Sequence, residues 1–285
     1  MTWWRVRFVV PTAFAESVAW MLAEELDHPA EIQDESTMSR DGDSSHSAVV
    51  LAFGERPDST KLDGDIRRAL APFNLEAVSI ETQRSEDESW REGWRAFFKS
   101  TALSDRIGVR PPWEPGIEAQ FNVVIDPGMA FGTGTHATTR GCMKMLDALL
   151  GEQDEIRILD VGCGSAILGI AAALLGHSVV GVDVDGDALR NAAHNLELNN
   201  VVSRVELIEG SAASVTEAFP LVVANILAPI LIENADAIGA RCSADLILSG
   251  LMRKHEADIS KAYSGFELVT RREEGEWIVL HLRLR

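Results

Sequence analysis

The sequence predicts an α/β protein in which a small ferredoxin-like α+β domain precedes a doubly wound sheet with a C-terminal antiparallel hairpin. Residues 1–84 alternate strand-like and helix-like segments in the order β-α-β-β-α-β, which is typical of ferredoxin-like domains. From residue 119 onward, buried strands alternate with helices, which indicates a parallel sheet. The last segment, FELVTRREEGEWIVLHLRL, contains two strand patterns around Glu274-Gly275 and predicts the hairpin.

The length of 285 residues suits two domains rather than one. We expect a first domain over 1–84, a linker helix and connecting segment over 85–118, and a second domain over 119–285. Trp90, Trp94 and Phe97 lie at spacings of four and three, so they share one face of the expected linker helix. This face is predicted to pack against a neighbouring domain.

The composition argues against several classes of protein. No apolar run reaches about 18 residues, so no membrane span is expected, and the charged N-terminus does not read as a signal peptide. Cys142, Cys163 and Cys242 show no paired spacing, so neither a metal site nor a disulfide is expected. A reducing cytoplasm is the simplest compartment, and we expect a monomer.

The formal net charge of -18 comes without a basic stripe, which argues against direct nucleic-acid binding. An acidic protein attracts a basic protein partner electrostatically. The alternative that the acidity only maintains solubility stays open.

The first domain shows a complete pattern of elements. Thr12 can cap a helix whose buried face carries Val18, Leu22 and Leu26. Nothing in this domain has a catalytic character, so its predicted role is to hold a partner or only to form a fold. Strand patterns occupy residues 2–10, 30–33, 48–53 and 75–82, and helical patterns occupy residues 13–26 and 61–70.

A glycine-rich turn follows the first strand of the main parallel run. Asp160 to Ser165 separates a strand ending at Leu159 from a helical run over Ala166 to Leu175. Gly162 and Gly164 allow a ligand to approach the backbone, and the helix start offers free N–H groups. Asp183 ends the next strand, where a carboxylate suits the two hydroxyls of a ribose. The unit therefore predicts a nucleoside-containing ligand, against the alternative of an α/β protein whose turn binds none.

A second glycine-rich loop, DPGMAFGTGTH over residues 126–136, leads into a helix expected from Ala137 to Leu150. Its small polar residues suit a loop that closes over a ligand beside the turn at Gly162. A lone histidine such as His136 is more often a satisfied hydrogen-bonding group than a base or a metal ligand.

The remaining elements continue the alternation, and Asp185 or Asp187 is expected to cap the helix that ends at Leu198. Asn225 closes the fourth main strand, where such a sheet places its ligands. The alternative interpretation is that Asn225 is an ordinary asparagine at the end of a strand, without a functional role. Further strands are expected at 204–210, 221–227 and 245–250, and further helices at 230–238 and 254–263.

The motif D-x-G-x-G, formed by Asp160, Gly162 and Gly164, resembles the first motif of class I S-adenosylmethionine-dependent methyltransferases. A dinucleotide fingerprint would need glycine at Ile167, so a dehydrogenase is the weakest interpretation. Methyl transfer to an amine needs an aligned, neutral nucleophile, so positioning is most of the catalysis. The Asn225 side-chain carbonyl and the Ile226 backbone carbonyl can accept hydrogen bonds from such an amine, which makes Asn225 the candidate catalytic residue.

Four motifs in this order carry a closer resemblance: DPGMAFGTGTHATT, ILDVGCGSAIL, VGVDVD and VVANILAPIL. Together with the small first domain, the W-x-x-x-W linker and RIGVRPPW, they resemble the ribosomal protein L-eleven methyltransferase family, PrmA, over essentially the whole chain. The resemblance implies a cytoplasmic bacterial enzyme. It implies methylation of lysine side chains and the N-terminal α-amine of one basic large-subunit ribosomal protein, which residues 1–84 would recognise.

The resemblance also implies that residues 119–285 bind S-adenosylmethionine, without a metal. By motif, the implied cofactor contacts fall on Thr139, Gly162, Asp183 and Asn225, beside Asp160 and Gly164 of the same turn. Phe131, Gly132, Thr133 and His136 would belong to the loop over the methionine end of the cofactor.

Two residues depart from the family pattern. Ala166 stands where the family usually has a glycine, and Ala137 stands where a proline usually precedes the threonines. We expect both to be tolerated, although the Ala166 methyl group could tighten the pocket.

Two other functions stay open. One is a lysine methyltransferase for a different protein, as in related enzymes that act on the electron-transfer flavoprotein β subunit. The other is a non-catalytic nucleoside-binding module or ribosome-assembly factor that kept the fold. Asp183 and Asn225 together argue against the second. The sequence leaves open which amines are methylated and how many methyl groups each receives.

Overall fold

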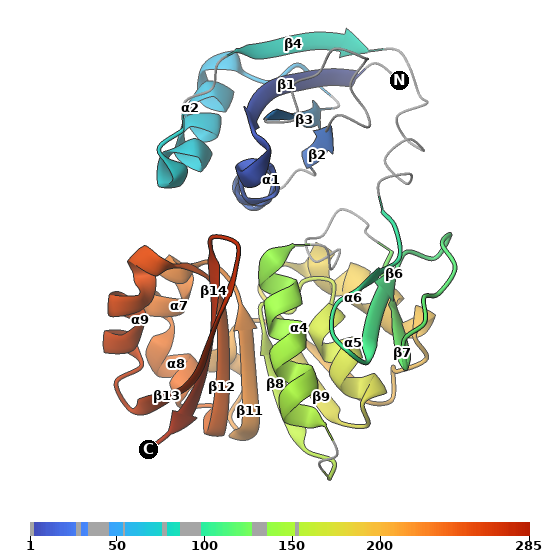
Figure 1. The fold of residues 1–285 in the computed structure, drawn as a ribbon, viewed down its shortest axis with the longest axis vertical. Coiled ribbons are helices and arrows are strands. Elements are labelled where there is room, and N and C mark those ends of the chain that lie inside the picture. Colours follow the sequence, from blue (N-terminus) through green and yellow to red (C-terminus); the bar gives the residue numbers. More distant parts are fainter. Residues whose placement is uncertain are drawn as a thin grey trace. The chain divides into compact units, whose positions relative to one another are not determined.

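A computed structural model describes residues 3–26, 30–33, 46–53, 55–75, 79–85, 98–126, 136–151 and 154–285 (Figure 1). The chain divides into two compact units, Met1–Phe97 and Phe98–Arg285. The division falls inside the segment that the sequence predicts as a linker, and the predicted linker helix with Trp90 and Trp94 lies outside the described residues. No helix in the described part of the chain combines the length and the apolar character needed to cross a membrane.

The N-terminal unit forms an antiparallel sheet in the order β2-β3-β1-β4, with its core on the side of α1 and α2. Alternate residues of β1, namely Val6, Phe8 and Val10, are buried in this core. Asp58 starts α2 by accepting hydrogen bonds from the backbone N–H groups of Thr60 and Lys61, both at 2.9 Å. The elements are β1 (Trp3–Pro11), α1 (Thr12–Leu26), β2 (Ala30–Gln33), β3 (His46–Phe53), α2 (Ser59–Leu70), the 3-10 helix η1 (Ala71–Phe73) and β4 (Ile80–Ser85).

The strand β4 begins and ends later than the sequence predicts, at Ile80 and Ser85 rather than 75 and 82. It lies at the edge of its sheet, and the side chains from Glu81 to Arg84 are all exposed. Apart from Ile80, which packs against the core, this edge strand carries no buried apolar residue between Glu81 and Arg84, so the pattern does not reveal its bounds.

The C-terminal unit is built around a sheet in the order β10-β9-β8-β11-β12-β14-β13. Its strands are parallel from β10 to β12, while β14 runs antiparallel to both β12 and β13. The strands are β8 (Arg157–Val161), β9 (Ser178–Asp183), β10 (Val205–Glu209), β11 (Phe219–Asn225), β12 (Cys242–Met252), β13 (Phe266–Glu274) and β14 (Trp277–Leu284). The strand order reverses between β8 and β11, which is the point where such a sheet binds its ligands.

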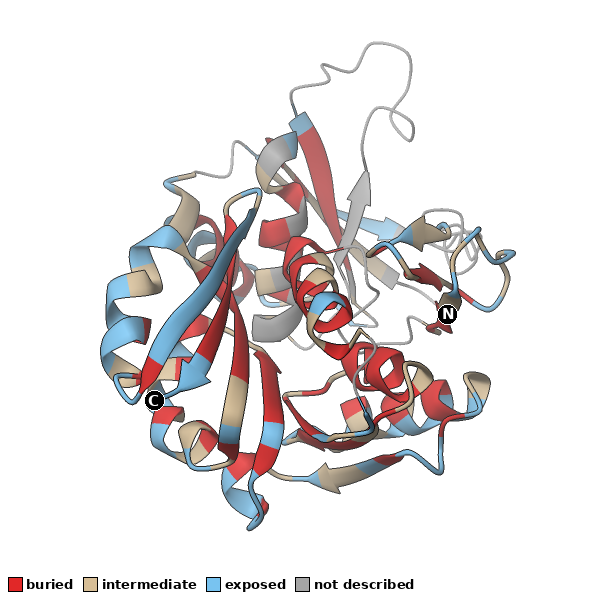
Figure 2. Ribbon diagram, turned by 60° about the horizontal axis from the view of Figure 1, so that its bottom comes forward, coloured by how far each residue is buried: buried red, intermediate tan, exposed pale blue. Residues whose placement is uncertain are grey.

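Helices cover both faces of this sheet (Figure 1). In β8, Ile158 joins the core shared with α4, α5 and α6, whereas its neighbour Leu159 joins the core shared with α7, α8 and α9. The strands between these cores are mostly buried, and the outer strand β13 is mostly exposed (Figure 2). The helices are α4 (Ala137–Leu150), α5 (Ile167–Leu174), α6 (Gly186–Leu198), α7 (Ala228–Glu233), α8 (Ala235–Gly239) and α9 (Glu256–Ala262), with 3-10 helices η3 (Ala212–Ser214) and η4 (Arg253–His255).

The predicted bounds of α4 are confirmed, and so is Asp185 as the cap of α6. The single helix predicted at 230–238 is wrong, because the structure ends α7 at Glu233 and begins α8 at Ala235. Pattern alone does not show this interruption at Asn234.

Ahead of the main sheet, β5 (Thr101–Ala102), β6 (Ile107–Arg110) and β7 (Phe121–Val124) form a small sheet. Arg106 fastens this sheet to α4, because its Nε donates to Asp147 Oδ1 at 2.6 Å and its Nη2 donates to the Asp147 carbonyl at 2.8 Å. A cation beside the last turn of a helix also interacts favourably with the helix dipole. The chain that leaves β7 toward Asp126 therefore starts from an anchored position.

Candidate functional site

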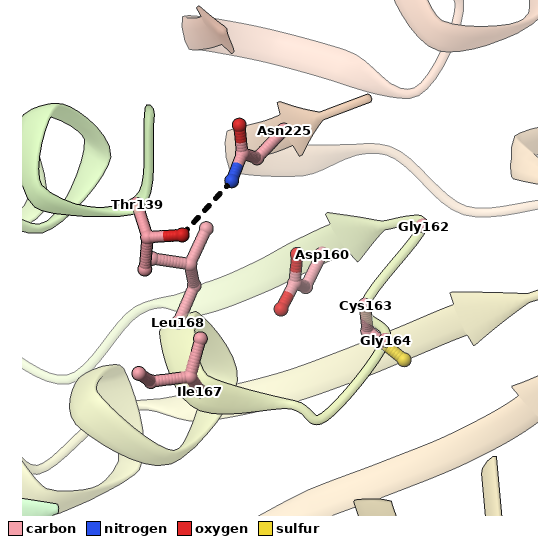
Figure 3. Close-up of a pocket in the computed structure, with 8 residues that line it drawn as sticks. All are labelled: Thr139, Asp160, Gly162, Cys163, Gly164, Ile167, Leu168 and Asn225. Carbon is pink, nitrogen blue, oxygen red and sulfur yellow. Dashed lines mark hydrogen bonds between the residues drawn. The ribbon is translucent and has the colours of Figure 1, made fainter. Parts of the chain in front are cut away.

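The candidate site lies where the strand order reverses, at the carboxyl ends of β8 and β11. The turn after β8 brings Asp160, Gly162 and Gly164 together, and β11 ends on Asn225 across from Thr139 of α4 (Figure 3). The pocket is lined by Thr139, Asp160, Gly162, Cys163, Gly164, Ile167, Leu168 and Asn225. The sheet topology thus gathers five of the predicted site residues around one cavity.

Two glycines with left-handed backbones enclose Ile226, the residue after Asn225. A Cβ atom on Gly162, where φ is 68°, would lie 2.3 Å from Ile226 Cγ2. A Cβ atom on Gly250, where φ is 86°, would lie 2.0 Å from the Ile226 carbonyl oxygen. Only glycine fits both positions, so the sequence at 162 and 250 fixes where the chain leaves β11 and where Asn225 stands.

Asn225 presents a buried acceptor that lacks a hydrogen-bond partner. Its Nδ2 atom donates to Thr139 Oγ1 across 3.5 Å, a long hydrogen bond (Figure 3). Its Oδ1 atom is buried and accepts no hydrogen bond in the structure. Such a group costs about 1–3 kcal/mol unless a donor reaches it. A ligand N–H group is the donor that this position can use.

Asp160 lines the pocket but also holds the start of α5. Its Oδ2 atom accepts a hydrogen bond from the backbone N–H of Gly169 at 3.2 Å, in the first turn of α5, where N–H groups have no partner within the helix. Burial raises the pKa of this carboxyl to about 7, with a smaller contribution from the charge of Asp183 and an opposing one from the Gly169 hydrogen bond. Asp160 therefore supports the turn as much as it faces a ligand.

Asp183 lies beside the turn and is half-buried. Its Oδ2 atom accepts from the Gly164 N–H at 2.8 Å, and its Oδ1 atom accepts from the Asp185 N–H at 3.1 Å. Each carboxylate oxygen keeps a second lone pair, so both can still accept from the hydroxyls of a ribose. The next residue, Val184, has 76% of its surface exposed, an apolar side chain that sequence reasoning missed.

His136 starts α4. Its Nδ1 atom accepts from the backbone N–H of Thr138 at 3.3 Å, and its ring packs edge-on against Trp277 at 5.2 Å between centroids. Burial, followed by the charge of Arg140, lowers the pKa of the ring to about 3, so His136 is neutral near pH 7. It does not line the pocket, and its observed role is to cap a helix.

The structure shows where Ala166 and Ala137, the two residues that depart from the family pattern, lie. Ala166 has φ of 61°, a left-handed backbone that is strained for any residue except glycine, and its side chain is buried in the core of α4, α5 and α6. It does not line the pocket, so the expected tightening is not seen there. Ala137 is the first residue of α4, the position that favours proline.

Some expected contacts lie elsewhere or were missed. Phe131, Gly132 and Thr133 lie outside the described residues. Cys163 lines the pocket, and burial raises the pKa of its thiol well above the usual range. The thiol is therefore uncharged and lines the pocket without acting as a nucleophile. Its place between the two motif glycines was the available signal. Within the described ranges, no three His, Cys, Asp or Glu side chains are grouped to hold a metal ion.

Comparisons with known proteins extend over the whole chain. A family model described as ribosomal protein L11 methyltransferase (PrmA) matches residues 2–285. The chain is 37% identical over 299 residues to the ribosomal protein L11 methyltransferase of Geobacter sulfurreducens, covering 99% of this chain and 98% of the relative. The corresponding protein of Citrifermentans bemidjiense is 40% identical over 206 residues, covering 69% of this chain and 67% of the relative.

A crystal structure of the ribosomal protein L11 methylase of Lactobacillus delbrueckii subsp. bulgaricus is similar with a TM-score of 0.60 and 29% identity. The match covers 66% of this chain and 100% of that one. The predicted resemblance is therefore confirmed: the chain belongs to the ribosomal protein L11 methyltransferase family, PrmA, a family of class I S-adenosylmethionine-dependent methyltransferases.

Proposed function

We propose that this protein transfers methyl groups from S-adenosylmethionine to amines of ribosomal protein L11, namely lysine side chains and the N-terminal α-amine. The observation that carries the proposal is the buried, partnerless Oδ1 atom of Asn225 at the reversal point of the sheet. Family membership supports the same reaction.

The residues fit the cofactor's nucleoside. Asp183 has free lone pairs for the ribose hydroxyls, and the exposed Val184 beside it offers an apolar surface to a base. Gly164 joins Asp183 to the pocket through its backbone N–H. When bound, S-adenosylmethionine supplies a methyl group made electrophilic by its sulfonium. The loop residues Phe131, Gly132 and Thr133 complete the proposed set of contacts, and His136, which caps α4 and does not line the pocket, would hold the end of that loop in place.

Asn225 orients the amine in this proposal. A lysine ammonium has a pKa near 10.4 in water, so the reacting amine must lose a proton before its lone pair is available. The Asn225 Oδ1 atom accepts an N–H from the neutral amine, while its Nδ2 atom stays on Thr139 and keeps the amide in place. His136 is too weak a base to take the proton, because burial lowers its pKa to about 3. In this proposal Asp160 holds the start of α5 through Gly169, and the proton leaves to solvent as the amine enters.

The N-terminal unit is proposed to be a ferredoxin-like domain that recognises the substrate. Its strand order and its two helices on one core support this architecture. The net charge of -18 on the chain favours a basic protein, which suits a ribosomal protein in the cytoplasm.

The direct test is to incubate the full-length protein with labelled S-adenosylmethionine and purified ribosomal protein L11, and to locate the methyl groups by mass spectrometry. The electron-transfer flavoprotein β subunit serves as the competing substrate. We expect label on L11 amines and none on the flavoprotein. Label on the flavoprotein alone would favour the other lysine methyltransferase, and no transfer to any protein despite cofactor binding would favour a non-catalytic module.

A further inference from the structure

A row of asparagines on α6 and its C-cap pairs with the backbone of the chain that leaves β7. Asn199 accepts from the Val124 N–H at 2.8 Å and donates to the Val124 carbonyl at 2.6 Å. Asn195 accepts from the Asp126 N–H at 2.9 Å, and Asn191 donates to the Asp126 carbonyl at 3.3 Å. We call Asn191, Asn195 and Asn199 the asparagine row.

The spacing of the row explains why it fits. Four residues of a helix rise about 6 Å, and two residues of a strand rise about 6.6 Å. Asn199 and Asn195 therefore meet Val124 and Asp126, which are two residues apart in the extended chain, while Asn191 reaches the carbonyl of the same Asp126. Their side-chain amides make the hydrogen bonds to the backbone of Val124 and Asp126 that a neighbouring strand would otherwise make.

Asn195 differs from its two neighbours because it also reaches the glycine-rich turn. Its Nδ2 atom donates to the Ser165 carbonyl at 3.1 Å, and the whole residue is buried with 0% exposure. Ser165 stands between Gly164 and Ala166, whose φ values of 53° and 61° are both left-handed. At Ala166 this backbone is strained, and it persists only where the surroundings hold it. One side chain thus ties Asp126 to the most strained part of the turn.

We propose that Asn195 is a positioning residue for the S-adenosylmethionine site, because it holds the turn at Ser165 at a fixed distance from the chain at Asp126. The inference rests on the proposed function, since it assigns the turn to that cofactor. Asn195 does not line the pocket and touches no reacting group, so it acts only through the turn.

The competing explanation is that Asn195 merely stabilises the packing of α6. Leu196 provides the matched control, because it is the next residue of α6 and is buried in the core, with 3% of its surface exposed. Leu196→Ala removes packing and stability without removing the bonds to Ser165 or Asp126. Asn195→Asp keeps the acceptor and removes the donor, because a carboxylate oxygen still accepts from the Asp126 N–H but cannot donate to the Ser165 carbonyl or to Asn191 Oδ1, which Asn195 Nδ2 also reaches at 3.2 Å.

The test compares full-length wild type, Asn195→Ala, Asn195→Asp and Leu196→Ala by calorimetric titration with S-adenosylmethionine and by thermal unfolding. We expect both Asn195 variants to raise Kd about tenfold or more, and Leu196→Ala to change it less than about threefold despite an equal or larger fall in Tm. In steady-state assays, KM for S-adenosylmethionine should rise in the same proportion, while kcat at saturating cofactor stays within about twofold. Such a split follows when only binding is affected.

An unchanged Kd in Asn195→Asp would overturn the positioning role, and so would an equal rise in Kd in Leu196→Ala. If Asn195→Ala does not fold, the Asp variant decides alone. A wild-type protein that binds no S-adenosylmethionine would instead overturn the proposed function, so the two failures are distinguishable.

Discussion

At the scale of single residues, Ala166 is the position where conformation and residue type disagree most. Its φ of 61° is left-handed, which costs a residue with a Cβ atom about 1–2 kcal/mol relative to glycine. We predict that Ala166→Gly raises the free energy of unfolding by about 1 kcal/mol, measured by urea denaturation.

The matched control is Ala192→Gly, in the interior of α6, where glycine should instead cost about 1 kcal/mol. A loss of stability in both variants would show that Ala166 does not carry the predicted strain.

Asp160 makes stability depend on pH in a direction opposite to that of an ordinary carboxylate. Burial raises its folded pKa to about 7, above the ordinary value of 3.8, so the folded state binds the proton more tightly. The stabilisation of the folded state by the protonated carboxyl is fully present below pH 3.8 and is lost as the pH rises to about 7. We predict that Asp160→Asn removes this decline. The free energy of unfolding of the variant, measured without cofactor, should therefore rise relative to that of wild type from pH 4 to about pH 7.

His136 affects the pH dependence of stability in the opposite direction. Its folded pKa of about 3 lies below the ordinary value of 6.5, so the stabilisation by the neutral ring is lost as the pH falls. Only the difference between wild type and Asp160→Asn therefore isolates Asp160. A difference that stays constant across this range would contradict the raised pKa.

The residue scale also shows what sequence could predict of the site. The motifs predicted that Asp160, Gly162, Gly164 and Asn225 meet, because parallel strands bring their carboxyl ends to one edge. They did not show that Asp160 and His136 hold the starts of α5 and α4, since a capping bond depends on which backbone N–H lies nearby in space. Gly250 was missed for the same reason, because its contact with Ile226 joins β12 to β11.

At the scale of elements, the start of α4 tests whether the second departure from the family pattern is neutral. Ala137 is the first residue of the helix, and His136 before it has ψ of 144°, which suits a residue that precedes proline. We predict that Ala137→Pro keeps the fold and raises the free energy of unfolding by about 0.4–1 kcal/mol.

Ala148→Pro, in the last part of the same helix, is the control and should cost about 3 kcal/mol or more. Denaturant titrations of both variants measure the contrast. A comparable loss in Ala137→Pro would mean that α4 begins differently.

Elements with a strong repeat and a cap were predictable, as α4 and α6 show. Elements whose position depends on tertiary pairing were not. The short strands β5 and β6 exist because they pair with each other and with β7, and the edge strand β4 carries exposed polar residues. No local period records such pairings.

At the scale of the whole molecule, the division at Phe97–Phe98 predicts separable functions. The C-terminal unit has two core clusters that contain residues of this unit alone, and every residue lining the pocket belongs to it. We therefore predict that a protein of residues 98–285 binds S-adenosylmethionine with an affinity within about threefold of that of the full chain. A loss of about 1.4 kcal/mol of binding free energy would already weaken the affinity tenfold. Its turnover of ribosomal protein L11 should fall at least tenfold.

Calorimetry and a methyl-transfer assay measure the two properties on the same preparation. Full turnover of L11 by residues 98–285 would exclude the N-terminal unit from substrate recognition.

The most direct measurement of the central claim is the single-turnover rate of methyl transfer to ribosomal protein L11 with S-adenosylmethionine saturating. Asn225→Ala removes the buried Oδ1 acceptor, so the rate should fall roughly a hundredfold as the amine loses its orientation, while cofactor affinity changes much less. Asn234→Ala, at a half-buried asparagine that follows α7 and does not line the pocket, should react at the wild-type rate. A wild-type rate for Asn225→Ala would contradict the account and leave Asn225 as the structural end of β11.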